Sequence, residues 1–375
     1  MSDNKRIAFL DYTRVAACLM VITYHVCSDT SFYYDAAARM TYFRNEDAHL
    51  WSTFYYILGH IGVPIFFMIS GWLLLPVAES ETTFGFYRRR FKRIIPPFLF
   101  FSVFYIFEPV IMGKADIHRQ LIELSNVPFT FAHSHLWYIY VLVGLYLAIP
   151  IISPWLRRAT AREELLLIGV FLLTSLLSPI SLRYRNVWGL AAWNQFHGLW
   201  YFSGYLGYFV TAHFIKTHIR WSTVTRLLVG SIGAVASFAT MYYLYYRGMT
   251  PGTPGTISYY GWYAIGYSSF FLIVLAVSLF LLFTAIPATI KTPRFVTELS
   301  RHSFGIYLLH RCIVGYVVLY LGALLPEMYG FKIPVAMVFT LVFSYLIIKA
   351  ASYLPGARYI VGSESKLPEY KRDKS

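Results

Sequence analysis

About ten stretches of this chain are apolar over roughly 20 residues each, the length that a helix needs to cross a membrane. Hydrophobic residues make up 57% of the 375 residues and charged residues only 13%, whereas about one quarter of a soluble domain is charged. These features exclude an ordinary soluble enzyme and a disordered protein. We therefore expect an all-α, polytopic membrane protein with spans near residues 7–28, 51–75, 95–113, 136–156, 165–182, 198–215, 226–246, 260–286, 303–323 and 334–354.

The lysines and arginines are distributed unevenly between the loops. If the N-terminus is cytoplasmic, most of the 32 Lys and Arg residues fall on the cytoplasmic side, as the positive-inside rule requires. We predict that both termini are cytoplasmic, that residues 1–355 form a membrane domain, and that residues 356–375 form a loose cytoplasmic tail. The net charge of +14 then reflects topology, and no nucleic-acid binding is expected.

The first predicted span carries three ionisable residues, Asp11, Arg14 and His25. Their presence, and the lack of a cleavage site, favour a retained helix over a signal peptide. At ~100° per residue, the Arg14 side chain falls within ~20° of His25 around the helix, and the Asp11 side chain falls within ~40° of His25. An Asp–Arg pair that orients helices, with a structural histidine, is the simplest alternative. Because charged groups inside a membrane are costly and usually functional, three on one face favour a reactive site.

The second span contains the sequence GVPIFFMISGWLL, in which Pro64 should kink the helix and free backbone carbonyls. Ser70 and Gly71 are small enough to admit a neighbouring helix or a thin ligand. The loop that follows reads FYRRRFKRIIPP, with four arginines and a lysine within six positions. Anchoring to anionic lipid explains part of this charge, but guanidinium groups also suit bidentate phosphate binding.

Two further histidine-containing segments precede or lie within later spans. His133 and His135 occur in HSHLWYIY, together with Trp137, and His310 occurs in SRHSFGIYLLH. Paired histidines suggest a metal, but no cysteine or carboxylate stands at ligand spacing, so no metal is expected. Three cysteines give no disulfide framework and are expected to pack as small apolar residues.

Six of these segments together resemble the acyltransferase-3 family of polytopic membrane acyltransferases. DYTRVAACLMVITYH is similar to the family's first helix, with Asp11, Arg14 and His25 in the matching places. The others are FFMISGWLL, RRRFKRIIP, HLWYIYVLVGLYLAIP, WYFSGYLGYFV and SRHSFGIYLLH. They follow the family's order from about residue 11 to residue 310.

The resemblance implies O-acyl transfer, most often of acetyl, from cytoplasmic acetyl-CoA to a hydroxyl of a lipid-linked or cell-surface glycan. The setting would be a bacterial inner membrane, with membrane lipid around the protein. It implies that His25 is the general base and that Arg14, with Asp11, stabilises charge developing near the thioester oxygen. Acetyl-CoA would be held through its phosphates and pantetheine arm by Arg88, Arg89, Arg90, Arg93, Ser70 and Gly71. The acceptor would be positioned by His135, Trp137 and His310.

Two other functions are compatible with ten spans and intramembrane charge. A transporter or flippase of lipid-linked glycan often shows paired inverted repeats, and no internal repeat is visible here. A non-catalytic sensor or assembly partner has no need of an aligned Asp–Arg–His set. The depth of His25, ~27 Å along the first helix from its inner end, further predicts a water-accessible funnel between the first four helices and the ninth.

Overall fold

The computed structural model describes residues 7–35, 40–183, 204–248, 265–321, 324–363 and 365. Within these ranges the regular structure is helical apart from one antiparallel hairpin, in which Phe32 pairs with Phe43. The sequence analysis did not predict this hairpin. Its elements are α1 (Ala8–Ser31), β1 (Phe32–Asp35), β2 (Met40–Phe43), α2 (Glu46–His60), α3 (Gly62–Leu74), α4 (Thr83–Ile111), α5 (Ile117–Asn126), η1 (Ser134–Leu136), α6 (Trp137–Leu156), α7 (Ala161–Arg183), α8 (Leu206–His218), α9 (Thr223–Gly248), α11 (Phe270–Thr284), α12 (Arg294–Tyr320), α13 (Tyr329–Ala351) and η2 (Ala357–Tyr359).

Within the described residues, six helical segments are long and apolar enough to cross a membrane. This confirms a membrane protein with many helical spans, while the total of about ten and the cytoplasmic termini stay predictions. Parts of the predicted spans 198–215, 260–286 and 303–323, and of the predicted tail, lie outside the described residues. The six segments are Glu46–Leu74, Thr83–Ile111, Ser134–Leu156, Thr223–Gly248, Arg294–Tyr320 and Tyr329–Ala351.

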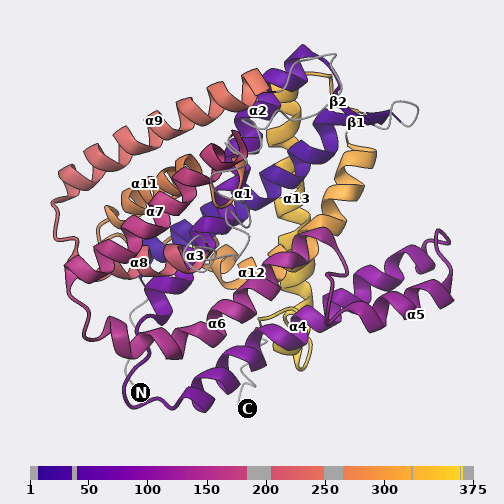
Figure 1. The fold of residues 1–375 in the computed structure, drawn as a ribbon. Helices are drawn as coiled ribbons and strands as arrows, with labels where there is room; N and C mark the ends of the chain where they lie inside the picture. Colours follow the sequence, from indigo (N-terminus) through magenta and orange to yellow (C-terminus); the bar gives the residue numbers. More distant parts are fainter. Residues whose placement is uncertain are drawn as a thin grey trace, which may run out of the picture.

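Helix α1 is the centre of the bundle and contacts α2, α3, α11, α12 and α13, as Figure 1 shows. Small residues permit this close packing. A Cβ atom on Gly62 of α3 would lie 2.7 Å from the carbonyl oxygen of Ala17 in α1. The two helix backbones therefore approach directly, and the polar residues of α1 face protein on several sides.

The second predicted span is a broken helix, with α2 ending at His60 and α3 beginning at Gly62. Pro64 lies in the first turn of α3, where its missing N–H is tolerated. Because Pro64 cannot donate to the carbonyl four residues earlier, the regular hydrogen-bond ladder is interrupted at the junction. The predicted kink is therefore present, and it lies just before the proline.

The arginine-rich segment is helical, which corrects its predicted place in a loop. Helix α4 begins at Thr83, and the Thr82 side chain caps it by accepting from the Gly85 N–H at 3.1 Å. Successive side chains on a helix point ~100° apart. Arg88, Arg89 and Arg90 therefore face different directions and do not form a single cationic surface.

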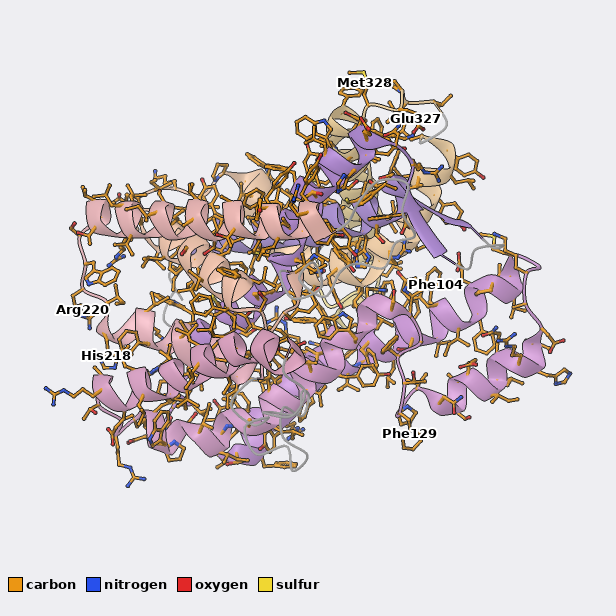
Figure 2. The ribbon with its side chains drawn as sticks, turned by 45° about the horizontal axis from the view of Figure 1, so that its top comes forward. Phe104, Phe129, His218, Arg220, Glu327 and Met328 are labelled. Carbon is orange, nitrogen blue, oxygen red and sulfur yellow. The ribbon has the colours of Figure 1, made fainter. Side chains whose placement is uncertain are left out.

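Helix α5 and the end of α4 extend away from the bundle at one side (Figure 1). None of the α5 residues is buried. Even the apolar side chains of Leu121 and Ile122 are 50% and 64% exposed. Phe129, which Figure 2 labels beyond the end of α5, is 89% exposed. An amphipathic helix with an open apolar face is typical of a membrane interface, and this helix was not predicted from the sequence.

Candidate active site

The three ionisable residues of α1 lie inside the bundle, and they do not share one cavity. Asp11 is 1% exposed and accepts a 2.5 Å hydrogen bond from Ser300 Oγ of α12. Arg14 Nη1 lies 3.8 Å from Asp11 Oδ1. His25 lies eleven positions beyond Arg14, or ~16 Å along the helix axis. The predicted pairing of Asp11 with Arg14 is present, and His25 belongs to a separate part of the interior.

Arg14 lines a cavity of about 320 Å³, which we call the arginine cavity. Three guanidinium groups face it besides Arg14, and they come from α4 and α12. Apolar side chains such as Ile69 and Leu142 line it as well. A narrow space with cations and apolar walls suits a ligand that has a charged head and a slender arm. The polar lining residues include Arg14, Ser70, Arg90, Arg93, Ser300 and Arg301.

The other residues predicted to hold the donor have different surroundings. Gly71 faces α8, where a Cβ atom would lie 2.6 Å from the backbone of Phe209, so its role is close helix packing. Arg89 forms an ion pair with Glu81, and Arg88 is exposed. Neither lines the arginine cavity. Ser70, Arg90 and Arg93 are thus the members of the predicted set that the structure brings together.

His25 lines a second cavity of about 220 Å³, which we call the histidine cavity. His135 and Trp137 also face it, so these three predicted site residues do meet. The Trp137 ring lies 5.1 Å from that of Tyr267, and Tyr24 completes an aromatic lining. Such rings offer broad apolar faces beside polar hydroxyls.

The histidines beside this cavity form a compact cluster from three segments of the chain. The His25 ring centroid lies 5.1 Å from that of His310 and 6.3 Å from that of His135. His135 Nε2 donates to the Leu308 carbonyl at 3.2 Å, so its Nδ1 accepts from His133 Nδ1 at 3.0 Å. His310 Nδ1 donates to the Tyr307 carbonyl at 2.5 Å.

These hydrogen bonds distinguish the imidazoles chemically. Both ring nitrogens of His135 are occupied when it is neutral, so it is a positioning group and a poor proton acceptor. Within the described part of the chain, no hydrogen bond engages the His25 ring. His25 faces the cavity with both nitrogens available to a ligand, which is what a general base requires.

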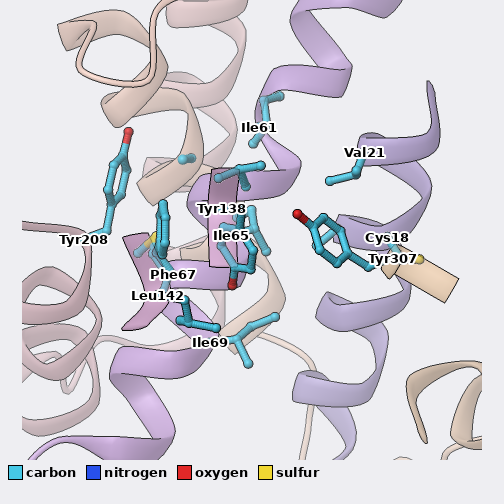
Figure 3. Packing of buried hydrophobic residues seen from close by; sticks show 14 of the residues in the cluster. Cys18, Val21, Ile61, Ile65, Phe67, Ile69, Tyr138, Leu142, Tyr208 and Tyr307 are labelled. Carbon is cyan, nitrogen blue, oxygen red and sulfur yellow. The ribbon is translucent and has the colours of Figure 1, made fainter. Parts of the chain in front are cut away.

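Two tyrosines separate the two cavities. Tyr138 of α6 and Tyr307 of α12 line the arginine cavity and the histidine cavity alike. Figure 3 shows the Tyr307 side chain pointing from α12 toward Tyr138. The Tyr307 hydroxyl is held by a hydrogen bond to the His135 carbonyl. In place of one continuous funnel, the structure has two cavities in this region, with the Tyr138–Tyr307 pair between them. The water access expected of the funnel stays a prediction.

Several residues of this site were not singled out from the sequence. Tyr307 and Arg301 lie within the quoted segment SRHSFGIYLLH, and Tyr138 lies within HLWYIY, so their segments were noticed but their side chains were not. Asp29 pairs with Arg311 beside the histidine cluster, with Arg311 Nη2 donating to Asp29 Oδ1 at 3.1 Å. The i,i+4 spacing of His25 and Asp29 on α1 was the available signal.

No group of three or more His, Cys, Asp or Glu side chains in the described ranges is arranged to hold a metal. Cys18 and Cys27 are free and buried, in accordance with the packing role expected of them.

The comparisons with known proteins identify the family of the chain. The family model of the acyltransferase-3 group, described as an acyltransferase domain, matches residues 7–349. No curated protein and no solved structure matches the chain. The matched range includes α1 with its Asp11, Arg14 and His25, both cavities, and the tyrosines between them. The chain therefore belongs to the acyltransferase-3 family of membrane proteins and is an acyltransferase.

Proposed function

We propose that this protein transfers an acetyl group from cytoplasmic acetyl-CoA to a hydroxyl of a cell-surface or lipid-linked glycan, in a bacterial inner membrane. The carrying observation is that Arg14 and His25, on one helix, face two adjoining cavities of different chemistry. The arginine cavity suits an anionic donor with a slender arm. The histidine cavity has an available imidazole and an aromatic lining that suits a sugar.

The proposed reaction follows from these positions. The acceptor oxygen attacks the thioester carbonyl carbon while His25 takes the hydroxyl proton. The tetrahedral intermediate then collapses, the C–S bond breaks, and the CoA thiolate leaves and takes up the proton from His25. His135, fixed by His133 and by the Leu308 carbonyl, holds one wall of the cavity. Trp137 supports the acceptor, and His310 packs against His25.

Arg14 takes a different role from the one first expected. Because it lies in the arginine cavity, ~16 Å along α1 from His25, it is too far away to stabilise an oxyanion at His25. We assign it to donor binding together with Arg90 and Arg93. Asp11, bonded to Ser300, fixes the orientation of Arg14 and is a positioning residue.

The experiment measures donor binding and acetyl transfer separately. The transfer measurement also identifies the acceptor. Purified protein in lipid nanodiscs should bind acetyl-CoA in calorimetry. In cells lacking the gene, wild type should restore O-acetyl groups on a surface glycan, measured by mass spectrometry. His25→Ala should retain donor binding and reduce transfer about 10²- to 10⁴-fold. His118→Ala, which removes an exposed histidine of α5, is the matched control.

Two outcomes would contradict the proposal in different ways. Undiminished acetylation by His25→Ala would show that His25 is not the base. If wild type does not bind acetyl-CoA, the acetyl-CoA donor is wrong, and a transport or assembly role for the same cavities becomes the better account.

A further inference from the structure

A third cavity, of about 430 Å³, lies beside the arginine cavity and is formed partly by the C-terminal segment. We call it the basic cleft. Among the described residues that line it, none is acidic and five are cationic. The charged and aromatic lining residues are Arg89, Lys92, Arg93, Arg301, Arg358 and Tyr359. A concave surface with this composition suits a polyanion with a planar ring.

The C-terminal segment that contributes to the cleft is firmly docked, although a loose tail was predicted from residue 356. Ser363 Oγ bonds to His302 Nδ1 at 2.8 Å in a buried position. Gly362 has φ +74°, and a Cβ atom there would lie 2.5 Å from the Phe304 ring. These contacts hold residues 356–363 against α12. The boundary of the membrane domain at residue 355 stays a prediction.

Tyr359 links this segment to the arginine-rich start of α4. Its ring centroid lies 4.7 Å from Arg358 Cζ and 5.9 Å from Lys92 Nζ. A cation within about 6 Å of the centroid of an aromatic ring is attracted by the electrons of the ring face. Two cations from distant parts of the sequence are thereby held at one edge of the cleft.

The cationic residues are ordered along the two cavities. Arg93 and Arg301 line both the arginine cavity and the basic cleft, and so lie where the two meet. Arg14 and Arg90 line only the arginine cavity. Arg358 lines only the basic cleft, with Arg89 and Lys92. A ligand that extends outward from the Tyr138–Tyr307 pair would therefore pass through the narrow arginine cavity, then between Arg93 and Arg301, and then into the basic cleft.

We propose that the basic cleft binds the 3′-phosphorylated nucleoside of the acyl-CoA donor, with Arg358 contacting the 3′-phosphate. This inference rests on the proposed function. Acyl-CoA has the matching order of parts: a thioester, a pantetheine arm, a diphosphate, and a ribose with a 3′-phosphate and adenine. The arm occupies the arginine cavity, the diphosphate lies between Arg93 and Arg301, and the terminal phosphate reaches Arg358.

The test compares two donors that differ by one phosphate. Affinities of acetyl-CoA and acetyl-3′-dephospho-CoA are measured by calorimetry with the full chain in phosphatidylcholine nanodiscs. Wild type should bind acetyl-CoA about tenfold more tightly, as expected for a charge-assisted hydrogen bond. Arg358→Ala and Arg358→Gln should lose this preference while binding the dephospho donor as wild type does. Arg158→Ala removes an exposed arginine outside the three cavities and should keep the preference.

Each other result overturns the inference. Equal binding of both donors by wild type, which needs no variant, would show that the 3′-phosphate is not recognised. If the Arg358 variants bind both donors more weakly by the same factor, Arg358 has a general structural role. Thermal stabilisation by phosphatidylglycerol that is lost in Arg358→Ala, without donor discrimination, would make the cleft a lipid-headgroup site. In these three cases the proposed function stands. If wild type binds neither donor, the proposed function fails too.

Discussion

The rings of Tyr138 and Tyr307 meet edge to face, with centroids 5.4 Å apart and planes at 67°. They occupy the junction between a cavity of about 320 Å³ that contains Arg14 and one of about 220 Å³ that contains His25. In the proposed reaction, the acyl group of a donor held by the arginines has to pass between these rings to reach His25. The pair is therefore placed to select the acyl group by size.

Enlarging this passage should change the choice of acyl group. We expect Tyr138→Ala to raise the rate of butyryl transfer relative to acetyl transfer about tenfold, since each methylene in a fitted pocket is worth about 1–3 kcal/mol. Tyr138→Phe preserves the ring and should preserve the wild-type ratio. The measurement is kcat/KM for the two acyl-CoA donors. An unchanged ratio in Tyr138→Ala would show that chain length is selected elsewhere.

The Asp29–Arg311 ion pair should be important for stability. Both groups are about four-fifths buried, with 23% and 21% of their side chains exposed. Arg311→Met leaves the Asp29 carboxylate without this partner, and we expect a loss of about 3–5 kcal/mol in unfolding free energy. Adding Asp29→Asn should recover most of that loss. Thermal unfolding in detergent measures the stability of both variants. A double variant that is no more stable than Arg311→Met would contradict the prediction.

Much of the site geometry was predictable from the sequence because it depends on a single helix. The spacing of Asp11, Arg14 and His25 fixes their common direction on any α-helix, and the hydropathy pattern places that helix in the membrane. The contact between His25 and His135 joins α1 to η1. The resemblance to a family named His135 as a residue that positions the acceptor, but it did not give this contact.

The rest depends on contacts between distant segments. The wall between the cavities needs α6 and α12 to bring Tyr138 and Tyr307 together, and no local pattern encodes that contact. The start of α4 was placed too late because charged residues were assigned to a loop, whereas arginine is a good helix former. The docking of residues 356–363 was missed because a short polar segment near a chain end usually lacks partners.

The close contact between α3 and α8 should make Gly71 intolerant of a side chain. In Gly71→Ala the new methyl group meets the Phe209 backbone, which cannot move as a flexible side chain would. We expect a loss of about 1–3 kcal/mol from overpacking. Gly144→Ala is the matched control, since nothing lies within 4 Å of a Cβ atom there. Similar melting temperatures for the two variants would argue against direct backbone packing at Gly71.

Glu327 should give the protein a pH-dependent increment of stability. Hydrogen bonds from the Tyr329 hydroxyl and from Lys332 hold the pKa of Glu327 below its ordinary value of 4.5. A lowered pKa stabilises the folded state above the ordinary value, and this stability is lost as the pH falls through the folded pKa. Glu327→Gln should therefore melt below wild type at pH 7. The difference should shrink steadily toward pH 3, and a constant difference would contradict this assignment.

The ring contact between Tyr138 and Tyr307 also bears on bioenergetics. An enzyme that passes an acyl group from one side of an energised bilayer toward the other risks becoming a proton leak. The two aromatic rings lie at the junction of the cavities, where they would narrow a column of solvent along α1 while no donor is bound. In the proposed reaction, the pair that admits the acyl group would also limit proton leakage across the membrane between turnovers.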